Sequence, residues 1–288
     1  MGSARDREVV VTRVDAGAAR ASQDRVVRER PLEIRAGSDA QDPLALVTTL
    51  RTPGHDEDLA VGWMIAEGLL DVSRASSELL GFRHGDPLRV RDPDDVLIAR
   101  LNAPLDPDLV AHRHTMATGS CGLCGRASIP ELIERIGALD VAAGWSVPWD
   151  VVASLPDRAR AAQRTFGSTG GLHATGVFDP SGELLVLRED VGRHNALDAA
   201  IGALARSDDA RPRAVALLSG RIGVELVSKA AAARIPVVAG IGAASDLAIA
   251  AADGLGVTLV GFLREGTGNI YTHPQRITGL DAGSREGD

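Results

Sequence analysis

The sequence predicts an α/β protein with a β-rich N-terminal part, and two observations support this fold class. Between residues 214 and 263, short apolar runs alternate with amphipathic segments in the order strand, helix, strand, helix, strand. Such a succession forms a parallel sheet with helices packed against it. The first hundred residues instead contain several stretches of alternating or β-branched residues separated by turn residues, a pattern typical of strands.

The N-terminal part is expected to contain strands, a helix and a hairpin. Alternating or β-branched residues predict strands at 8–14, 31–37 and 44–54. Residues 56–70 begin with acidic side chains and continue with apolar residues at helical spacing, which predicts an amphipathic helix. Residues 87–101 return to the pattern of a β-hairpin.

Turn-forming residues dominate the middle of the chain at 102–127, where we place a domain junction. A helix is expected directly after it, because Ser128 and Glu131 have capping-box spacing and Pro130 falls in the first turn. The expected organisation is a β-rich N-terminal subdomain at 1–115, a mobile cysteine loop at 116–127, an α/β domain at 128–278 and a disordered tail at 279–288.

The C-terminal half is expected to supply the parallel sheet. Its strands are predicted at 214–220, 235–242 and 257–263, with helices between them at 221–235 and 245–256. Since the carboxyl ends of parallel strands share one edge, the loops that follow these strands should lie together, and ligands of open α/β sheets bind at that edge. These loops are 219–223, 240–245 and 262–267. They contain small residues and glycines together with Arg221 and Arg264, which favours a phosphate-bearing ligand.

Composition and charge exclude several classes of protein. The 288-residue chain has a net charge of −8 and a sequence pI near 5.4, which argues against a nonspecific nucleic-acid binder. The start of the chain lacks the apolar segment of a secretory signal, and the apolar region 235–262 is interrupted by Asp246 and Asp253. We therefore expect a cytoplasmic protein with reduced thiols, bound neither to nucleic acid nor to a membrane.

Both cysteines of the chain, Cys121 and Cys124, lie in one C-x-x-C motif that allows three interpretations. A structural zinc site needs four ligands, which His112 and His114 could complete. The zinc-deaminase pattern has a proline before its first cysteine, where this chain has Ser120. Zinc is therefore not favoured, and no metal site is expected.

The second interpretation is a dithiol redox motif, and the third is a nucleophilic or carrier thiol. Thioredoxin-like chains place their C-x-x-C soon after the first strand, whereas this motif follows about 120 residues of largely strand-like sequence. Gly119, Gly122 and Gly125 would leave the sulfurs unobstructed, and Arg126 and the following helix N-terminus would favour the thiolate. A carrier thiol that transfers a sulfur atom is the favoured interpretation.

Two further stretches contain candidate ligand-binding residues. Residues 166–179 are expected to form a Gly-rich loop with His173 between strand-like flanks. Residues 188–204 place several polar side chains near the start of a predicted helix: Asp190, Arg193, His194, Asn195 and Asp198. Helix capping accounts for Asp190 and Asn195, and Asp198 would share a helix face with His194. Capping does not account for the Arg-His-Asn run, which favours a functional site.

Taken together, these stretches resemble one family, the FdhD formate dehydrogenase accessory sulfurtransferases. The resemblance runs from about Pro31 to Tyr271. It rests on an ordered set of motifs, "PLEIR", "RTPGHDEDLAVGWMIAEGLL", "SCGLCGRASI", "STGGLHATG", "REDVGRHNALD", "SGRIGVELVSKA", "IPVVAGIGA" and "TLVGFLREGTGNIYT".

The resemblance implies a fold, a reaction and partners. It implies a C-terminal domain similar to the cytidine deaminases without their zinc ligands. It also implies a sulfur carrier that accepts persulfide sulfur from a cysteine desulfurase and passes it to the Mo-bis(molybdopterin guanine dinucleotide) cofactor before formate dehydrogenase receives that cofactor. Members are generally homodimers, and GDP is the expected analogue of the cofactor.

The same resemblance assigns candidate site residues. Cys121 matches the persulfide-forming cysteine, and Cys124 matches the second cysteine of the motif. The cofactor-binding stretch matches Phe262, Leu263, Arg264, Glu265, Gly266 and Thr267. To these we add four residues from the neighbouring segments, Gly220, Arg221, His194 and Asn195.

Overall fold

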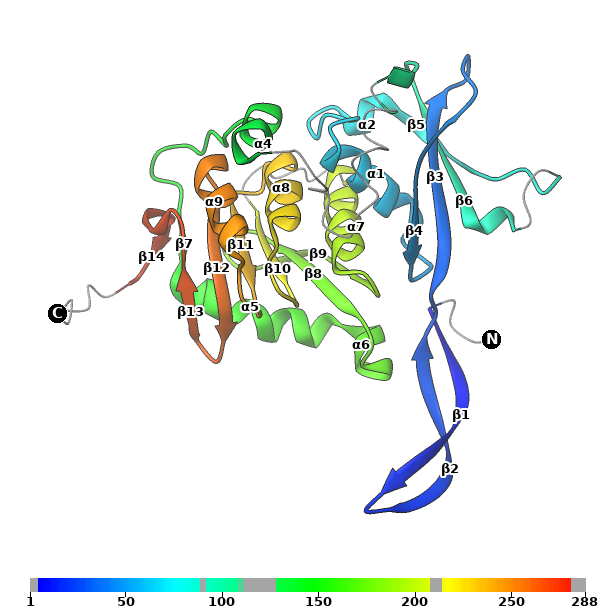
Figure 1. The fold of residues 1–288 in the computed structure, drawn as a ribbon. Helices are drawn as coiled ribbons and strands as arrows, with labels where there is room; N and C mark the ends of the chain where they lie inside the picture. The colour runs from blue at the N-terminus through cyan, green and yellow to red at the C-terminus, as the bar shows by residue number, and fades with distance from the viewer. Residues whose placement is uncertain (1–4, 89–91, 109, 111–127, 208–213, 281–288) are drawn as a thin grey trace.

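A computed structural model describes residues 5–88, 92–108, 110, 128–207 and 214–280, and within them a large sheet lies between layers of helices (Figure 1). This six-stranded sheet of the described chain has the order β13-β12-β11-β10-β8-β9. Its strands are β8 (His173–Phe178), β9 (Leu184–Asp190), β10 (Val215–Leu218), β11 (Val237–Gly240), β12 (Thr258–Arg264) and β13 (Thr267–Ile270). Strands β10, β11 and β12 are parallel, as predicted, whereas β8, β9 and β13 pair antiparallel and make the sheet mixed.

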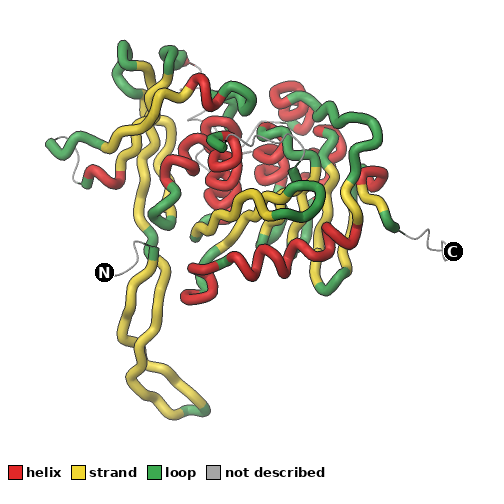
Figure 2. The backbone as a smooth tube through the Cα atoms, turned by 180° about the vertical axis from the view of Figure 1, so that it is seen from behind, coloured by secondary structure: helices red, strands yellow, loops and turns green. Residues whose placement is uncertain are grey.

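Helices cover both faces of this sheet (Figures 1 and 2). One face carries α7 (Arg193–Ala205), α8 (Val224–Ala232) and α9 (Asp246–Leu255), and the other carries α5 (Trp149–Ala162). The burial pattern follows the alternation of a strand, because Ala216 and Leu218 pack with the first group of helices while Val215 and Leu217 pack with α5. The short helix α6 (Arg164–Thr169) continues from α5 toward β8.

The N-terminal part contains a second, four-stranded sheet of described residues in the order β4-β3-β6-β5. Its strands are β3 (Arg30–Ser38), β4 (Leu44–Arg51), β5 (Leu79–His84) and β6 (Val96–Leu101). The strands expected at 31–37 and 44–54 are confirmed, with the second ending at Arg51. The hairpin expected within 87–101 is wrong in one respect, since β6 takes its antiparallel partner β5 from residues before that segment.

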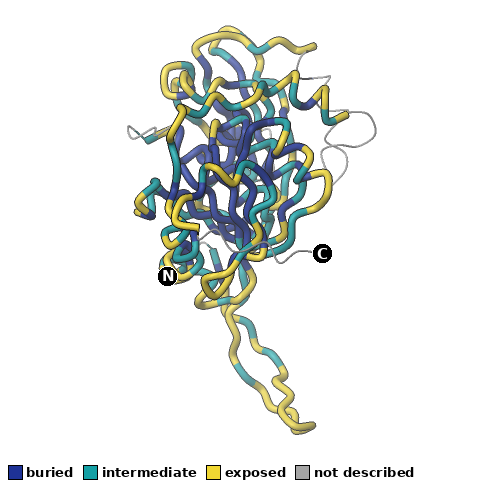
Figure 3. Tube along the Cα trace, turned by 90° about the vertical axis from the view of Figure 1, so that its left-hand side faces the viewer, coloured by how far each residue is buried: buried dark blue, intermediate teal, exposed yellow. Residues whose placement is uncertain are grey.

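The first two strands form a ribbon that projects from the body. β1 (Asp6–Asp15) contains the strand expected at 8–14 and pairs antiparallel with β2 (Ala18–Val27). Most of the ribbon is exposed, as Figure 3 shows, and Val10 and Val14 are 79% and 66% exposed.

Helix α1 (Asp56–Ala66) joins the two parts of the chain by packing against α7. It is shorter than the expected 56–70 because Gly68 adopts a left-handed φ of 66° just beyond its end. One continuous hydrophobic core contains Leu32 and Ile34 of β3, Met64 of α1 and Leu197 of α7. The N-terminal sheet is therefore packed onto the helical layer of the C-terminal half.

The remaining elements are short. They are α2 (Ala75–Glu78), the 3₁₀ turns η1 (Pro93–Asp95) and η2 (Pro274–Arg276), α4 (Ile129–Ile136), and the parallel pair β7 (Val147–Pro148) and β14 (Ile277–Thr278). Helix α4 begins at the predicted place, and both reciprocal bonds of the capping box between Ser128 and Glu131 are formed. The predicted cysteine loop at 116–127 and residues 281–288 of the predicted tail lie outside the described residues. No described helix has the length and apolar character needed to cross a membrane.

Candidate functional site

The three loops expected at the carboxyl edge of the parallel strands lie side by side and are hydrogen-bonded to one another. The Ile222 N–H donates to the Ala243 carbonyl at 2.9 Å, and the Ser245 N–H donates to the Ile222 carbonyl at 3.0 Å. The Phe262 N–H in turn donates to the Gly242 carbonyl at 3.0 Å. The first residues of α8 and α9 therefore sit at the same edge as the end of β12.

Gly242 permits this close approach of two loops. A Cβ at this position would lie 2.8 Å from the carbonyl oxygen of Gly220 and 2.9 Å from the backbone nitrogen of Arg221. Any side chain would therefore push the first two loops apart, which explains the glycine in the "GIGAAS" stretch.

The predicted cofactor-binding stretch has an unusual backbone. Phe262 and Glu265 adopt left-handed φ values of 54° and 51°, Gly266 has φ of 76°, and the pairing of β12 with β13 shifts register between Gly261 and Arg264. Such conformations cost about 1–3 kcal/mol each in non-glycine residues and concentrate at functional sites. Phe262 is 41% exposed.

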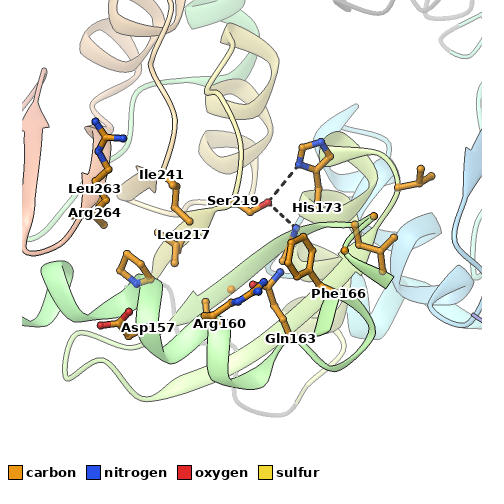
Figure 4. A pocket seen from close by; sticks show the side chains of 18 of the residues that line it. Asp157, Arg160, Gln163, Phe166, His173, Leu217, Ser219, Ile241, Leu263 and Arg264 are labelled. Carbon is orange, nitrogen blue, oxygen red and sulfur yellow. Dashed lines mark hydrogen bonds between the residues drawn. The ribbon is translucent and has the colours of Figure 1, made fainter. Parts of the chain in front are cut away.

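A cavity of about 690 Å³ opens between this edge and the helices α5 and α6 (Figure 4). Three members of the predicted stretch line it, Leu263, Arg264 and Glu265. The ends of β10 and β11 contribute Leu217, Ser219 and Ile241. The opposite wall comes from α5, α6 and the residue that joins them: Pro156, Asp157, Ala159, Arg160, Gln163 and Phe166. A third side comes from β8 and the turn before it and includes Leu172 and His173.

Two guanidinium groups, Arg160 and Arg264, line this cavity together with the carboxylates of Asp157 and Glu265. Arg160 lies over the ring of Phe166 at 4.2 Å from the centroid, and Arg264 is exposed at the end of β12. Neither forms an ion pair with an acidic side chain of the described residues. An anionic ligand could therefore pair with both cations without displacing an existing partner.

His173 begins β8 in the wall of the cavity, next to Ser219. The Ser219 hydroxyl accepts a hydrogen bond from the Ala174 N–H at 2.9 Å and lies 3.5 Å from His173 Nδ1 (Figure 4). Burial lowers the pKa of His173, and the nearby charges of Arg193 and His194 lower it further, so the imidazole is neutral at neutral pH. The strand expected before the Gly-rich stretch 166–179 is wrong, because helix α6 occupies that position.

The other candidates lie at the edge without lining the cavity. Gly220 packs against the His173 ring, Arg221 is exposed in the β10–α8 loop, and Gly266 and Thr267 belong to the turn between β12 and β13. His194 pairs with Glu225 of α8 at 2.8 Å. The catalytic candidates Cys121 and Cys124 lie outside the described residues.

Residues at the start of α7 bind the N-terminal sheet, although they also lie near the strand-end edge of the large sheet. The Asn195 side-chain amide donates to the Leu50 carbonyl at 2.7 Å and to Asp190 at 3.2 Å. Asp190 does not cap α7, whose N-cap is Gly192 without a side-chain bond. Its carboxylate instead accepts the backbone N–H groups of Thr52 and Gly192 at 2.9 and 2.8 Å, so the capping predicted for Asp190 is wrong.

The predicted shared face of His194 and Asp198 is confirmed. His194 pairs with Glu225, and one helical turn later Asp198 accepts two hydrogen bonds from Lys229 at 2.8 Å. The His194–Glu225 pair and the Asp198–Lys229 pair both join α7 to α8. The side chain of Asp198 is almost fully buried.

Asp190 should give the fold a measurable pH dependence. Burial raises the pKa of its carboxyl to about 6, against the opposing effect of its hydrogen bonds from Gly192, Thr52 and Asn195. The folded protein therefore holds this proton more tightly than the unfolded chain, so the stabilisation is present below pH 4 and is lost as pH rises through 6. A shift of this size corresponds to about 2–3 kcal/mol.

The check is urea unfolding of the wild type and of Asp190→Asn between pH 4 and pH 7. We expect the stability of the wild type relative to the variant to fall by about 2–3 kcal/mol as pH rises across this range. A difference that stays constant over the range would contradict the assignment.

Sequence reasoning missed the wall of the cavity that α5 provides. The apolar residues Val152, Leu155 and Ala159 have helical spacing and become the buried face of α5, so the helix itself had a local signal. Nothing in that segment indicates that Asp157 and Arg160 face the end of β12, because that strand lies about one hundred residues later.

Comparisons with known proteins point to one family over nearly the whole chain. The sequence profile of the FdhD/NarQ family matches residues 27–278. A protein of Nocardia farcinica named "Sulfur carrier protein FdhD" is 39% identical over 97% of both chains, and one of Streptomyces avermitilis with the same name is 40% identical over the full length of both. A solved structure described as a formate dehydrogenase accessory protein, from Desulfotalea psychrophila, has a TM-score of 0.69 at 20% identity and covers 95% of this chain and 99% of its own. This last similarity supports the mixed α/β fold, and the cytidine-deaminase-like description of the C-terminal domain stays a prediction.

Proposed function

This chain belongs to the FdhD/NarQ family, and we propose that it is a sulfur carrier that serves the maturation of formate dehydrogenase. The proposal is supported by relatives of that name that match it from end to end. The structural observation that supports it best is a cavity beside the strand-end edge that is lined by Arg160 and Arg264, neither of which forms an ion pair with an acidic side chain in the described part of the chain.

In the proposed reaction, Cys121 is the sulfur carrier. Its thiolate attacks the terminal sulfur of a persulfide on a cysteine desulfurase, so that a sulfur–sulfur bond forms at Cys121 and the bond in the donor breaks. The donor cysteine leaves as a thiolate, so atoms and charge balance and no oxidant is needed. From their places in the sequence, Arg126 and the helix N-terminus that follows at Ser128 would favour the thiolate form of Cys121.

The proposed acceptor of this sulfur is the Mo-bis(molybdopterin guanine dinucleotide) cofactor, bound as a substrate. A guanine dinucleotide has diphosphate groups, and an acidic protein can hold them only through local donors. Arg160 and Arg264 are such donors, and Ser219 and the neutral His173 add uncharged hydrogen-bonding groups. The apolar side chains of Leu217, Ile241 and Leu263 also line the cavity and could pack against a ring system.

The partners in this proposal are a cysteine desulfurase as donor, formate dehydrogenase as recipient, and a second copy of this chain in a homodimer. The expected place of action is the cytoplasm, with no contact to nucleic acid or membrane. The proposed role of Cys124 is secondary, since a persulfide relay needs one carrying thiol.

Arg264→Ala should weaken GDP binding about tenfold or more. A charge-assisted contact between a guanidinium and a phosphate contributes roughly 1.5–3 kcal/mol, and Arg264 lines the cavity at the end of β12. Titration calorimetry with GDP measures this loss directly.

Arg221→Ala is the matched control for this prediction, because Arg221 is also an exposed arginine of the edge but does not line the cavity. Its GDP affinity should stay close to that of the wild type. If Arg221→Ala lost as much GDP affinity as Arg264→Ala, the diphosphate would lie over the β10–α8 loop instead of in the cavity.

A further inference from the structure

The ribbon formed by β1 and β2 has no role in the cavity, and the family profile begins at residue 27, where the ribbon ends. At its base the ribbon is held to the body, because Asp6 pairs with Arg25 at 2.9 Å and accepts a hydrogen bond from the Ser168 hydroxyl of α6 at 3.4 Å. Beyond the base it stands away from the body (Figures 1 and 3). A two-stranded ribbon without a covering layer is only marginally stable in water, so this one is expected to have a partner.

Both strands of the ribbon present a free edge. In the described chain, β1 and β2 pair with each other over ten residues and with no further strand. The N–H and C=O groups that point outward from β2 therefore have no strand partner within the described residues. A long exposed edge of this kind is a template on which another chain can add a strand.

The charges on β2 are poorly satisfied within the ribbon itself. Arg20 stands directly opposite Arg13 of β1, and like charges that are directly opposite destabilise an antiparallel pair. Neither arginine forms an ion pair with another described residue. Asp24 points to the same face of β2 as Arg20 but lies four residues further along, roughly 13 Å away on an extended strand. Its only described hydrogen bond is the one that it accepts from the N–H of Arg25.

The order of these charges is complementary to itself. Arg20 and Asp24 lie at equal distances from Ser22, one on each side. When β2 is set antiparallel to β2 of a second copy about a two-fold axis at Ser22, each Arg20 faces Asp24 of the other copy. The remaining opposed positions bring no like charges together: Ala21 faces Gln23, Ala19 faces Arg25 and Ala18 faces Val26.

We propose that two copies of this chain associate through the outer edge of β2, so that their ribbons form one four-stranded antiparallel sheet in the order β1-β2-β2-β1 with Ser22 at its centre. The two Arg20–Asp24 pairs set the register, and the same patch is used by both copies, as a two-fold axis requires. This inference rests on the homodimer of the proposed function and names the surface at which that dimer forms.

Disulfide cross-linking tests the register. The full-length protein with Cys121→Ala and Cys124→Ala provides a chain without other cysteines, to which Ser22→Cys is added. Opposed residues of an antiparallel pair have Cα atoms about 4.5–5.5 Å apart, which a disulfide can span. Mild oxidation should therefore convert most of this variant to a covalent dimer on a non-reducing gel, and a reductant should reverse it.

Val11→Cys in the same cysteine-free chain is the matched control. Val11 lies directly opposite Ser22 in the ribbon and is also half-buried, but it belongs to β1. In the proposed sheet its two copies are three strand spacings apart, roughly 14 Å, so no cross-link should form. Cross-linking through Val11→Cys in place of Ser22→Cys would overturn the proposal in favour of pairing through β1.

Exchange of the two charges tests the ion pairs by sedimentation of the otherwise wild-type protein. Arg20→Asp sets two aspartates against each other at both ends of the interface, and Asp24→Arg does the same with arginines. Each variant should raise the dissociation constant of the dimer about tenfold. The double variant Arg20→Asp/Asp24→Arg restores both opposite-charge pairs and should return the dissociation constant close to that of the wild type.

The outcomes separate this inference from the proposed sulfur carrier. A dimeric wild type whose dissociation constant ignores both charge changes, or whose Ser22→Cys chain forms no cross-link, would overturn the pairing through β2 and assign the ribbon to another partner. A monomeric wild type would overturn the homodimer together with this surface. The formation of a persulfide on Cys121 is measured independently, so neither result would touch the proposal that the chain carries sulfur.

Discussion

Cys121→Ala is expected to abolish formate dehydrogenase maturation completely, because the proposed relay has no other carrier for the sulfur atom. The wild type, incubated with a cysteine desulfurase and cysteine, should gain the mass of one sulfur atom on the peptide that contains Cys121. The variant should gain none at that position. Mass spectrometry of the intact protein and of its peptides measures both results.

Cys124→Ala separates the relay from the two other interpretations of the motif. A disulfide or a zinc site needs both sulfurs equally, whereas a relay needs Cys121 to attack and carry. We therefore expect Cys124→Ala to retain the persulfide at Cys121. Normal maturation by Cys121→Ala would refute the relay, and one equivalent of zinc in the freshly purified protein would favour the metal interpretation instead.

Gly202→Ala is expected to be strongly destabilising, because the added methyl group would fall in the close crossing of helices α1 and α7. Helices α1 and α7 cross in direct backbone contact, so that a Cβ at Gly202 would lie 1.9 Å from the carbonyl oxygen of Asp58. At the matching position of α1, a Cβ at Gly62 would lie 1.7 Å from the carbonyl oxygen of Asp198. Both obstacles are backbone atoms, so a rotamer change cannot relieve the clash and the helices must move apart.

The cost of that movement should reach or exceed the upper end of measured overpacking penalties, about 3 kcal/mol. For a chain of this length each kcal/mol corresponds to roughly 2–4 °C in Tm, so Gly202→Ala should melt about 6–12 °C below the wild type by calorimetry. The same separation would strain the contacts of Asn195 with Leu50 and of Thr52 with Asp190, which join the N-terminal sheet to the start of α7.

Gly167→Ala is the matched control, because Gly167 also lies in a helix but a Cβ there would meet nothing within 4 Å. Alanine has the higher helix propensity, so this variant should be unchanged or slightly more stable. Equal melting temperatures for Gly202→Ala and Gly167→Ala would contradict the tight crossing of α1 and α7.

Local signals in the sequence determined much of the fold. The alternation of strands and helices after residue 214 predicted β10, α8, β11, α9 and β12 in the right order and with parallel pairing. The capping box at Ser128 located the start of α4 to the residue. These signals succeed because a strand repeat, a helix repeat or a cap is contained within about ten neighbouring residues.

The motifs of the sequence also determined the family, which the comparisons confirm. They directed attention to the strand-end edge, where Leu263, Arg264 and Glu265 do line a cavity. The assignment of site residues to steps of the reaction stays a prediction.

Only the tertiary structure decided which polar residues are available to a ligand. Asn195 and Asp190 look alike in sequence as helix-start residues, yet both are engaged with the backbone around Leu50 and Thr52, far away in the chain. Arg160 and Asp157 carry no motif, yet α5 places them in the wall of the cavity. Hydrogen-bond partners and cavity walls are contributed by segments more than one hundred residues apart. Their meeting depends on how whole layers pack, so no window of neighbouring residues contains the information.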